Sequence, residues 1–101
     1  MAGDQPSPLD TASAQVLREL AVRYGVRDIR VFGSRSRGDA RPDSDLDLLV
    51  RVDYERGVGR RLVRFCLEAS RLLGLRVDVV TERSLDPTLH ARILREARAL
   101  P

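Results

Sequence analysis

The 101-residue sequence contains one cysteine, Cys66, and no tryptophan, lysine or asparagine. A single cysteine excludes an intramolecular disulfide and a cysteine-based metal cluster. No apolar run approaches the roughly 20 residues that a membrane-spanning helix needs. No apolar stretch follows a basic region at the N-terminus, so no signal peptide is visible. These absences predict a cytoplasmic protein with no membrane contact.

Basic charge is abundant and comes from one residue type. All eighteen basic residues are arginine, set against fifteen acidic residues, for a net charge of +3 and an isoelectric point near 10.0. Such a value points either to a nucleic-acid partner or to the composition of a GC-rich genome. Only four residues are aromatic and no stacking platform or known binding motif is present, so a nucleic-acid partner is the less favoured interpretation.

The charge is unevenly distributed along the chain. Residues 39–53 hold five aspartates and two arginines, whereas residues 56–76 hold six arginines and one glutamate. The basic segment places Arg56, Arg60, Arg61, Arg64 and Arg71 mostly on one side of an expected helix. This basic face is either simply solvated or a contact surface for a partner, and the sequence leaves both open.

Hydrophobic periodicity predicts one small α/β (α+β) domain over residues 10–101, preceded by a flexible tail at residues 1–9. The first helix is expected over about 10–24, with a possible start signal at Ser7-Pro8 and a stop at Gly25. The remaining elements are strands at 28–32, 44–52 and 75–80, a helix at 55–73 and a last helix that starts after Pro87 and extends to Leu100. The strands form a three-stranded sheet with the helices packed on it.

Three aspartates carry the first chemical signal. Asp45 and Asp47 are two residues apart in an expected strand, so both carboxylates project from one face. Asp78 lies within an apolar strand, where an unpaired carboxylate is costly. Side by side, these strands would gather three carboxylates, an arrangement suited to Mg²⁺ or Mn²⁺. Two such ions can hold the attacking and leaving oxygens of a phosphoryl or nucleotidyl transfer.

The turn after the first strand carries the second signal. Gly33 lets a phosphate approach the backbone closely, and Ser34 supplies a hydroxyl donor. Arg35 and Arg37 are near enough in sequence to contact phosphate oxygens. A Gly-Ser turn followed by Asp-x-Asp on the next strand predicts a site that binds a nucleoside triphosphate together with a divalent metal ion.

Each feature alone has an ordinary structural explanation, and the combination is what favours a metal site. An EF-hand is excluded, because a calcium loop starting at Asp43 would have Leu48 at the required glycine and Tyr54 at the required glutamate. His90 has no second histidine or cysteine nearby, which disfavours zinc. Cys66 falls on the apolar stripe of its helix and is better explained as a core residue.

These motifs resemble the nucleotidyltransferase superfamily that includes DNA polymerase beta. More narrowly, the sequence is similar to the minimal nucleotidyltransferases, which are antitoxin partners of HEPN-domain toxins. The resemblance rests on VFGS (31–34), RSRGDARP (35–42), SDLDLLV (44–50) and VDVV (77–80). It covers nearly the whole chain and implies a three-stranded mixed sheet with about four packed helices.

The resemblance also implies roles for these residues. Gly33 and Ser34 would bind the β- and γ-phosphates of ATP, while Asp45 and Asp47 would hold two Mg²⁺ ions. Asp78 would ligate the catalytic ion and assist deprotonation of the acceptor hydroxyl. The reaction would transfer AMP from ATP to a hydroxyl, typically of a tyrosine, on the cognate HEPN-type toxin and neutralise it within a hetero-oligomer.

The short chain agrees with a partner that completes the site. Only twenty-three residues follow Asp78, enough for one helix and too few for an acceptor-binding domain. The alternative hypothesis is a non-catalytic antitoxin that neutralises the toxin by complex formation alone. The acceptor residue, base selectivity and stoichiometry are not visible in the sequence.

Overall fold

The first helix is defined by side-chain and glycine signals at its two ends. The structure, a computed structural model, describes residues 9–101, and α1 spans Thr11–Tyr24. Asp10 accepts a hydrogen bond from the Ser13 N–H at 2.6 Å, and Gly25 ends the helix in the left-handed region. The helix predicted over about 10–24 is confirmed, and the start signal at Ser7-Pro8 lies outside the described residues. The predicted flexible tail lies outside the described residues except for Leu9, which is buried in the core.

Four strands form a mixed sheet in the order β3-β2-β1-β4. Strand β1 (Val26–Phe32) pairs antiparallel with β2 (Leu46–Val52), which pairs parallel with β3 (Val77–Thr81). The three predicted strands are confirmed, with ends shifted by one or two residues. The three-strand prediction is wrong by one, because Arg98–Ala99 forms a short β4 against β1.

The other helices are α2 (Ser34–Arg37), α3 (Val58–Leu73) and α4 (Pro87–Glu96), and Glu82–Ser84 forms one 3₁₀ turn. The expectation of about four helices is confirmed. Helix α4 ends at Glu96 and not at Leu100, since Ala97 is extended and leads into β4. Asp86 caps α4 by accepting from the Leu89 N–H at 2.9 Å. None of the helices among the described residues is long and apolar enough to cross a membrane.

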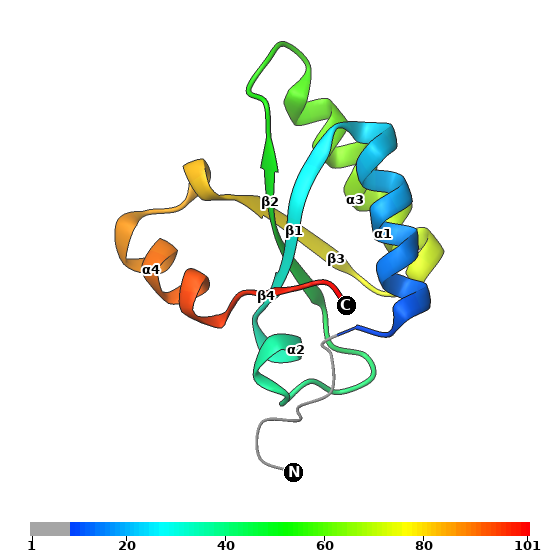
Figure 1. The fold of residues 1–101 in the computed structure, drawn as a ribbon, viewed down its shortest axis with the longest axis vertical. Helices are drawn as coiled ribbons and strands as arrows, with labels where there is room; N and C mark the ends of the chain where they lie inside the picture. Colours follow the sequence, from blue (N-terminus) through cyan, green and yellow to red (C-terminus); the bar gives the residue numbers. More distant parts are fainter. Residues whose placement is uncertain (1–8) are drawn as a thin grey trace.

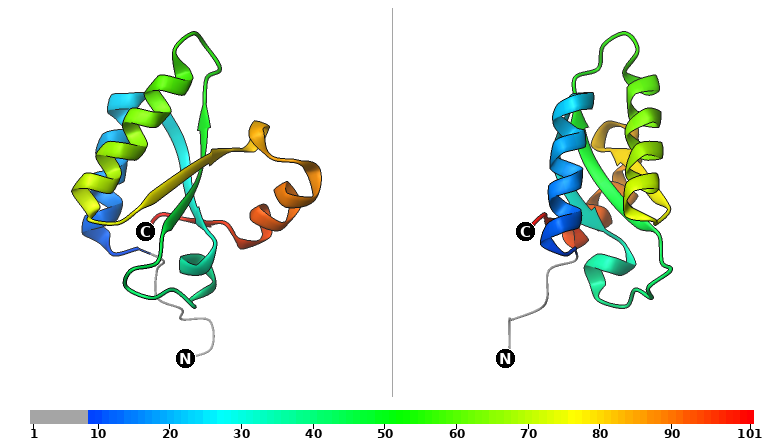
Figure 2. Two further views of the ribbon diagram at one scale, coloured as in Figure 1. Left: turned by 180° about the vertical axis from the view of Figure 1, so that it is seen from behind. Right: turned by 90° about the vertical axis from the view of Figure 1, so that its right-hand side faces the viewer.

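Helices α1 and α3 lie together on one side of the sheet, and α4 lies on the other (Figures 1 and 2). The core fills the space between the sheet and the α1–α3 pair. Phe65 of α3 is fully buried there and meets Tyr24 edge-on, with ring centroids 6.4 Å apart. Along β2 the core side chains are Leu46, Leu48, Val50 and Val52. Because side chains alternate along a strand, Asp47 points to the opposite face, toward α4.

Candidate active site

The register of β2 and β3 brings the aspartates together. Asp47 and Asp78 are direct neighbours in the parallel pair, and Asp45 lies just before β2 begins at Leu46. The Arg76 Nε lies 3.8 Å from a carboxylate oxygen of Asp45 and 3.8 Å from one of Asp78. Arg76 itself is largely exposed. These three aspartates form a carboxylate cluster, and the guanidinium of Arg76 lies at its edge.

The surroundings of Asp47 shift the pKa of its carboxyl group. Its partial burial raises the pKa of its carboxyl above the ordinary value, and the nearby charges of Asp78 and Asp45 raise it further. Arg37 acts in the opposite direction and does not offset these effects. The surroundings of Asp47 therefore disfavour its ionised form.

The donor set fits Mg²⁺ in chemistry. Within residues 9–101 no three Asp, Glu, His or Cys side chains converge tightly enough to form a ready-made metal cage. However, hard oxygen ligands at neighbouring register positions and a carboxyl with a raised pKa are the conditions that a divalent cation relieves. Rotation of Asp45 and Asp78, which are about half exposed, would bring their oxygens toward Asp47.

The turn at Gly33 packs directly against this cluster. Phe32 is the register neighbour of Asp47, so the next residue lies beside the Asp47 carboxylate. Gly33 adopts φ 75° and ψ −154°, a conformation essentially restricted to glycine. A Cβ at this position would overlap Asp47 Oδ2 and lie 3.2 Å from its Cγ. Glycine is required here for both reasons, and Ser34 then begins α2.

A cleft of about 530 Å³ joins the turn to the carboxylates. Gly33, Ser34, Arg37, Asp45 and Asp47 line its polar side. Its apolar side is formed by Phe32, Val80, Leu85, Leu89 and Ile93. The β2–β3 pairing places Asp78 next to Asp47, although Asp78 does not line the cleft itself. The cleft offers an apolar wall for a ring and polar groups for anionic oxygens.

The two arginines of the turn have different surroundings. The Arg35 guanidinium donates to the carbonyls of Ser44 at 2.7 Å and Pro42 at 3.3 Å, so it braces the loop before β2 and does not line the cleft. Arg37 lines the cleft. Its guanidinium donates to Asp39 and Glu96, and these hydrogen bonds raise its pKa. Of these two arginines, Arg37 is therefore the one placed to contact a ligand in the cleft.

Glu96 is a cleft residue that the sequence analysis missed. Its carboxylate accepts from the Gly33 N–H at 3.2 Å and from Arg37 at 3.1 Å, and Arg92 lies 3.6 Å away. Although burial raises the pKa of Glu96, these partners together hold it below the ordinary value. In the sequence it is one glutamate on a polar helix side, and nothing there marks it as part of the site.

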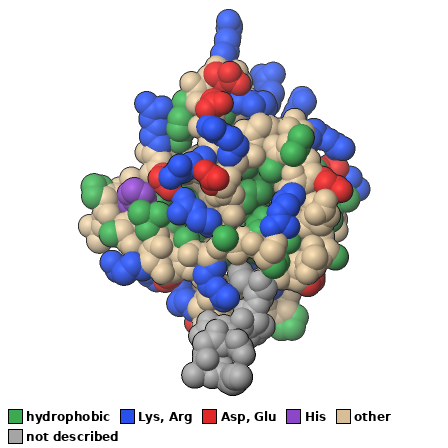
Figure 3. Space-filling model, in the orientation of Figure 1, with side chains coloured by type: hydrophobic (Ala, Val, Ile, Leu, Met, Phe, Trp, Pro, Cys, Tyr) green, Lys and Arg blue, Asp and Glu red, His purple; other side chains and the backbone are tan. Residues whose placement is uncertain are grey.

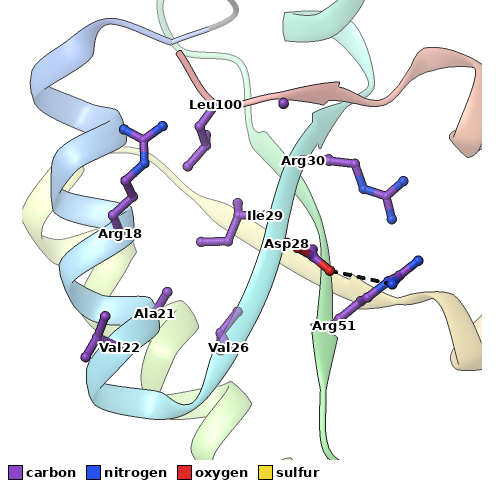
Figure 4. Close-up of a pocket in the computed structure, with 10 residues that line it drawn as sticks. Arg18, Ala21, Val22, Val26, Asp28, Ile29, Arg30, Arg51 and Leu100 are labelled. Atoms are coloured by element: carbon purple, nitrogen blue, oxygen red, sulfur yellow. Dashed lines mark ion pairs between the residues drawn. The ribbon is translucent and has the colours of Figure 1, made fainter.

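A larger pocket of about 720 Å³ lies away from the carboxylates, between α1, β1 and the C-terminal residues (Figure 4). Its floor is apolar, with Ile29 and Leu100 pointing inward. Its arginines have partners of their own: Arg18 donates to the Pro101 carbonyl, and Arg51 lies 3.6 Å from Asp28. Asp28 is the one acidic residue among the described residues that line this pocket, so the pocket has no group of carboxylates that could bind a divalent cation.

Two further residue groups lie outside the site. The Cys66 thiol donates to the Val77 carbonyl at 2.6 Å, and burial raises its pKa, which agrees with a packing role. On the face seen in Figure 3, arginine and acidic side chains are interspersed and no continuous basic patch appears.

Known nucleotidyltransferases are similar to this chain in sequence. The profile described as "Nucleotidyltransferase domain" matches residues 13–100. Protein adenylyltransferase MntA of Thermococcus cleftensis is 48% identical over 84 residues, which cover 78% of this chain and 79% of that protein. A protein assigned as an adenylyltransferase in Methanocaldococcus jannaschii is 40% identical over 81 residues, covering 77% of this chain and 83% of that protein.

Solved structures agree in fold. A structure assigned as a minimal nucleotidyltransferase superposes with a TM-score of 0.76 at 46% identity and covers 88% of this chain and 90% of its own. The toxin–antitoxin complex MntA–HepT contains a chain that superposes with a TM-score of 0.64 at 18% identity, covering 88% of this chain and 69% of that chain. The similarity to the latter concerns the fold.

Proposed function

This chain belongs to the nucleotidyltransferase domain family, and from that premise we propose that it is an antitoxin that transfers AMP from ATP to a hydroxyl group of a toxin protein. The observation that carries the proposal is the contact between the Gly33 turn and Asp47 within a cleft that also holds Asp45. Further support comes from similarity to MntA of T. cleftensis, which is itself a protein adenylyltransferase.

We assign the acidic residues to metal binding. Asp45 and Asp47 would hold Mg²⁺, with Asp78 as the third carboxylate and Mn²⁺ as a possible substitute. Bound Mg²⁺ supplies charge neutralisation for the phosphates and polarises the reacting oxygens. The raised pKa of Asp47 agrees with this assignment, because partial burial and the nearby charges of Asp78 and Asp45 disfavour its ionised form, and a bound cation would relieve both effects.

The polar turn would bind the anionic part of ATP. Ser34 donates its hydroxyl to the terminal phosphates, and Arg37 provides a fixed cation at the cleft wall. The apolar side chains of Val80, Leu85 and Leu89 give the base or ribose a surface to pack on. No side chain of the cleft selects adenine in an evident way, so the base preference rests on the similarity to adenylyltransferases.

The transfer step follows from these roles. The acceptor oxygen forms a bond to the α-phosphorus of ATP. The bond between that phosphorus and the oxygen that bridges the α- and β-phosphorus atoms breaks. Pyrophosphate leaves, and the carboxylate of Asp78, the neighbour of Asp47 in the sheet, would take up the acceptor proton. The product is an AMP ester of the acceptor hydroxyl.

The partner is proposed to be a HEPN-type toxin, with a tyrosine as the acceptor and a hetero-oligomer as the assembly. Complexes of MNT antitoxins with HEPN toxins include a tri-AMPylated toxin, and one toxin–antitoxin structure contains AMP-PNP. These chains are 18% and 23% identical to this protein and share its fold. A cytoplasmic location remains a prediction of the sequence.

The test uses ATP labelled at either the α- or the γ-phosphate, incubated with the protein, Mg²⁺ and its HEPN partner. Transfer of the α label alone supports the proposal, whereas transfer of the γ label would indicate phosphorylation. Asp45→Asn with Asp47→Asn should abolish labelling and leave the complex intact. Asp43→Asn, an exposed aspartate of the same loop, is the matched control.

The same variants distinguish catalysis from simple complex formation. Protection from the toxin that is lost with the double variant, while the complex persists, supports adenylyl transfer as the neutralising step. Full protection by the double variant, with no α label on the toxin in any sample, would instead support the non-catalytic antitoxin.

A further inference from the structure

Glu96 connects the end of α4 to the turn that begins at Gly33, 63 residues earlier in the chain. One carboxylate oxygen accepts from the Gly33 N–H and the other from the Arg37 guanidinium. The backbone carbonyl of Glu96 accepts from the Ser36 hydroxyl. All three contacts fall on the turn that carries Ser34, so one residue fixes both ends of it.

The contact leaves Arg37 with a defined orientation. The Arg37 Nε donates a hydrogen bond to the Asp39 carboxylate at 3.3 Å, and one terminal nitrogen of Arg37 donates to the Glu96 carboxylate at 3.1 Å. None of the described residues 9–101 accepts a hydrogen bond from the other terminal nitrogen, and the Arg37 side chain is 42% exposed in the cleft. A guanidinium held at two of its nitrogens loses little further freedom when the third meets an anion.

Glu96 itself is well held. Its side chain is only 18% exposed, and its partners keep it ionised at neutral pH. Since Gly33 N–H is occupied by Glu96, that N–H is not a free donor for a ligand. The phosphate-facing groups of the turn are then Ser34 and Arg37, and Glu96 determines how both are presented.

We propose that Glu96 is a positioning residue that orients Arg37 and the Gly33–Ser34 turn toward the β- and γ-phosphates of the nucleotide. This inference rests on the proposed function, because it needs a nucleotide in the cleft. Glu96 acts through Arg37 and makes no contact with the reacting atoms.

A purely structural role for the Glu96 carboxylate is distinguishable from this one. Helix α4 stays attached through other groups: Ile93 is 4% exposed, Ser36 bonds the Glu96 backbone and β4 follows directly. Loss of the carboxylate charge therefore leaves α4 in place and releases Arg37. The consequence should be seen in nucleotide affinity more than in the free energy of unfolding.

The experiment measures binding of ATP and of AMP, each with Mg²⁺, to the full chain by titration calorimetry. Glu96→Gln should weaken ATP binding about tenfold, the size expected for one charge-assisted contact, and change AMP binding less than about twofold. In the Arg37→Ala background the same substitution should have little further effect. With the toxin present, KM for ATP should rise while kcat changes little.

Glu68→Gln is the matched control, since Glu68 also pairs with an arginine, Arg71, but lies on α3 far from the cleft. It should leave both affinities unchanged. Denaturation curves establish that each variant is folded. If Glu96→Gln is not, Glu96→Asp keeps the charge with a shorter reach and should show a smaller loss of ATP affinity.

Several results would overturn the inference. Equal losses for ATP and AMP, full additivity with Arg37→Ala, or tighter ATP binding by Glu96→Gln would each contradict a positioning role. The last result would mean that Glu96 competes with phosphate. If the wild-type protein binds no ATP, the proposed function fails as well, whereas normal ATP binding by both wild type and Glu96→Gln removes only this inference.

Discussion

Gly33→Ala is the substitution for which the structure allows the sharpest estimate. The backbone at this position has φ 75° and ψ −154°, and placing a non-glycine residue there costs about 1–3 kcal/mol. The added Cβ would also overlap Asp47 Oδ2. The side chain of Asp47 can rotate away, so we expect the protein to remain folded, since domains of this size have about 5–15 kcal/mol of stability.

The rotation of Asp47 is the second consequence. A carboxylate displaced from the cluster no longer faces Asp45 and Asp78 at the same distance, so Gly33→Ala should weaken Mn²⁺ binding about tenfold or more, equal to about 1.4 kcal/mol. Urea denaturation measures the stability change, and Mn²⁺ electron paramagnetic resonance measures the metal affinity.

Gly38→Ala is the matched control. Gly38 also has positive φ, 82°, but no atom lies within 4 Å of the position of an added Cβ. It should lose about 1–2 kcal/mol of stability from the backbone conformation alone and keep its Mn²⁺ affinity. The contact between the turn and Asp47 would be refuted if Gly33→Ala bound Mn²⁺ as tightly as wild type. It would also be refuted if Gly33→Ala and Gly38→Ala lost the same amount of Mn²⁺ affinity.

Three further predictions concern the cluster and the core. Burial and the neighbouring carboxylates raise the pKa of Asp47 in the folded state. The ionisation of Asp47 therefore lowers the free energy of unfolding as pH rises above the ordinary carboxyl pKa. Asp47→Asn should raise the urea midpoint relative to wild type at pH 7, and the two midpoints should converge below the ordinary carboxyl pKa. The Arg76 guanidinium competes with Mn²⁺ for Asp45 and Asp78, so Arg76→Ala should tighten Mn²⁺ binding. The gain should be no more than about fivefold, because these contacts are solvent-exposed. Unchanged or weaker Mn²⁺ binding would contradict this competition. Phe65→Ala should cost about 3–5 kcal/mol of unfolding free energy, and a cost below about 1 kcal/mol would mean that the α3 packing is misplaced.

Local sequence signals predicted most of the fold. Gly25 ends α1 as expected, and hydrophobic periodicity located β2. The helix expected from residue 55 begins at Val58, because Gly57 has φ 86° and cannot continue a helix backward. Strand β4 has two residues and exists only through pairing with β1, so no periodicity could reveal it.

The candidate site was predictable to a similar degree. Spacing alone indicated that Asp45 and Asp47 share a face, whereas the pairing of β2 with β3 was needed to show that Asp78 is the neighbour of Asp47. Arg35 and Arg37 are equivalent in sequence, but only tertiary contacts decide that Arg35 braces the Ser44 loop while Arg37 lines the cleft. Glu96 belongs to the site by long-range contact, which a linear pattern does not record.

The chain path also sets the order in which the site can form during folding. Strands β1 and β2 are joined through residues 33–45, so the Gly33 turn and Asp47 can meet through a short loop. Asp78 arrives only after the parallel crossover through α3, and Glu96 only after a separation of 63 residues. Contacts of large sequence separation close late, and synthesis releases the N-terminal elements first. A nascent chain that stops before α4 would therefore have the carboxylates but not Glu96, which orients Arg37. We expect such a chain to bind nucleotide less tightly than the full chain.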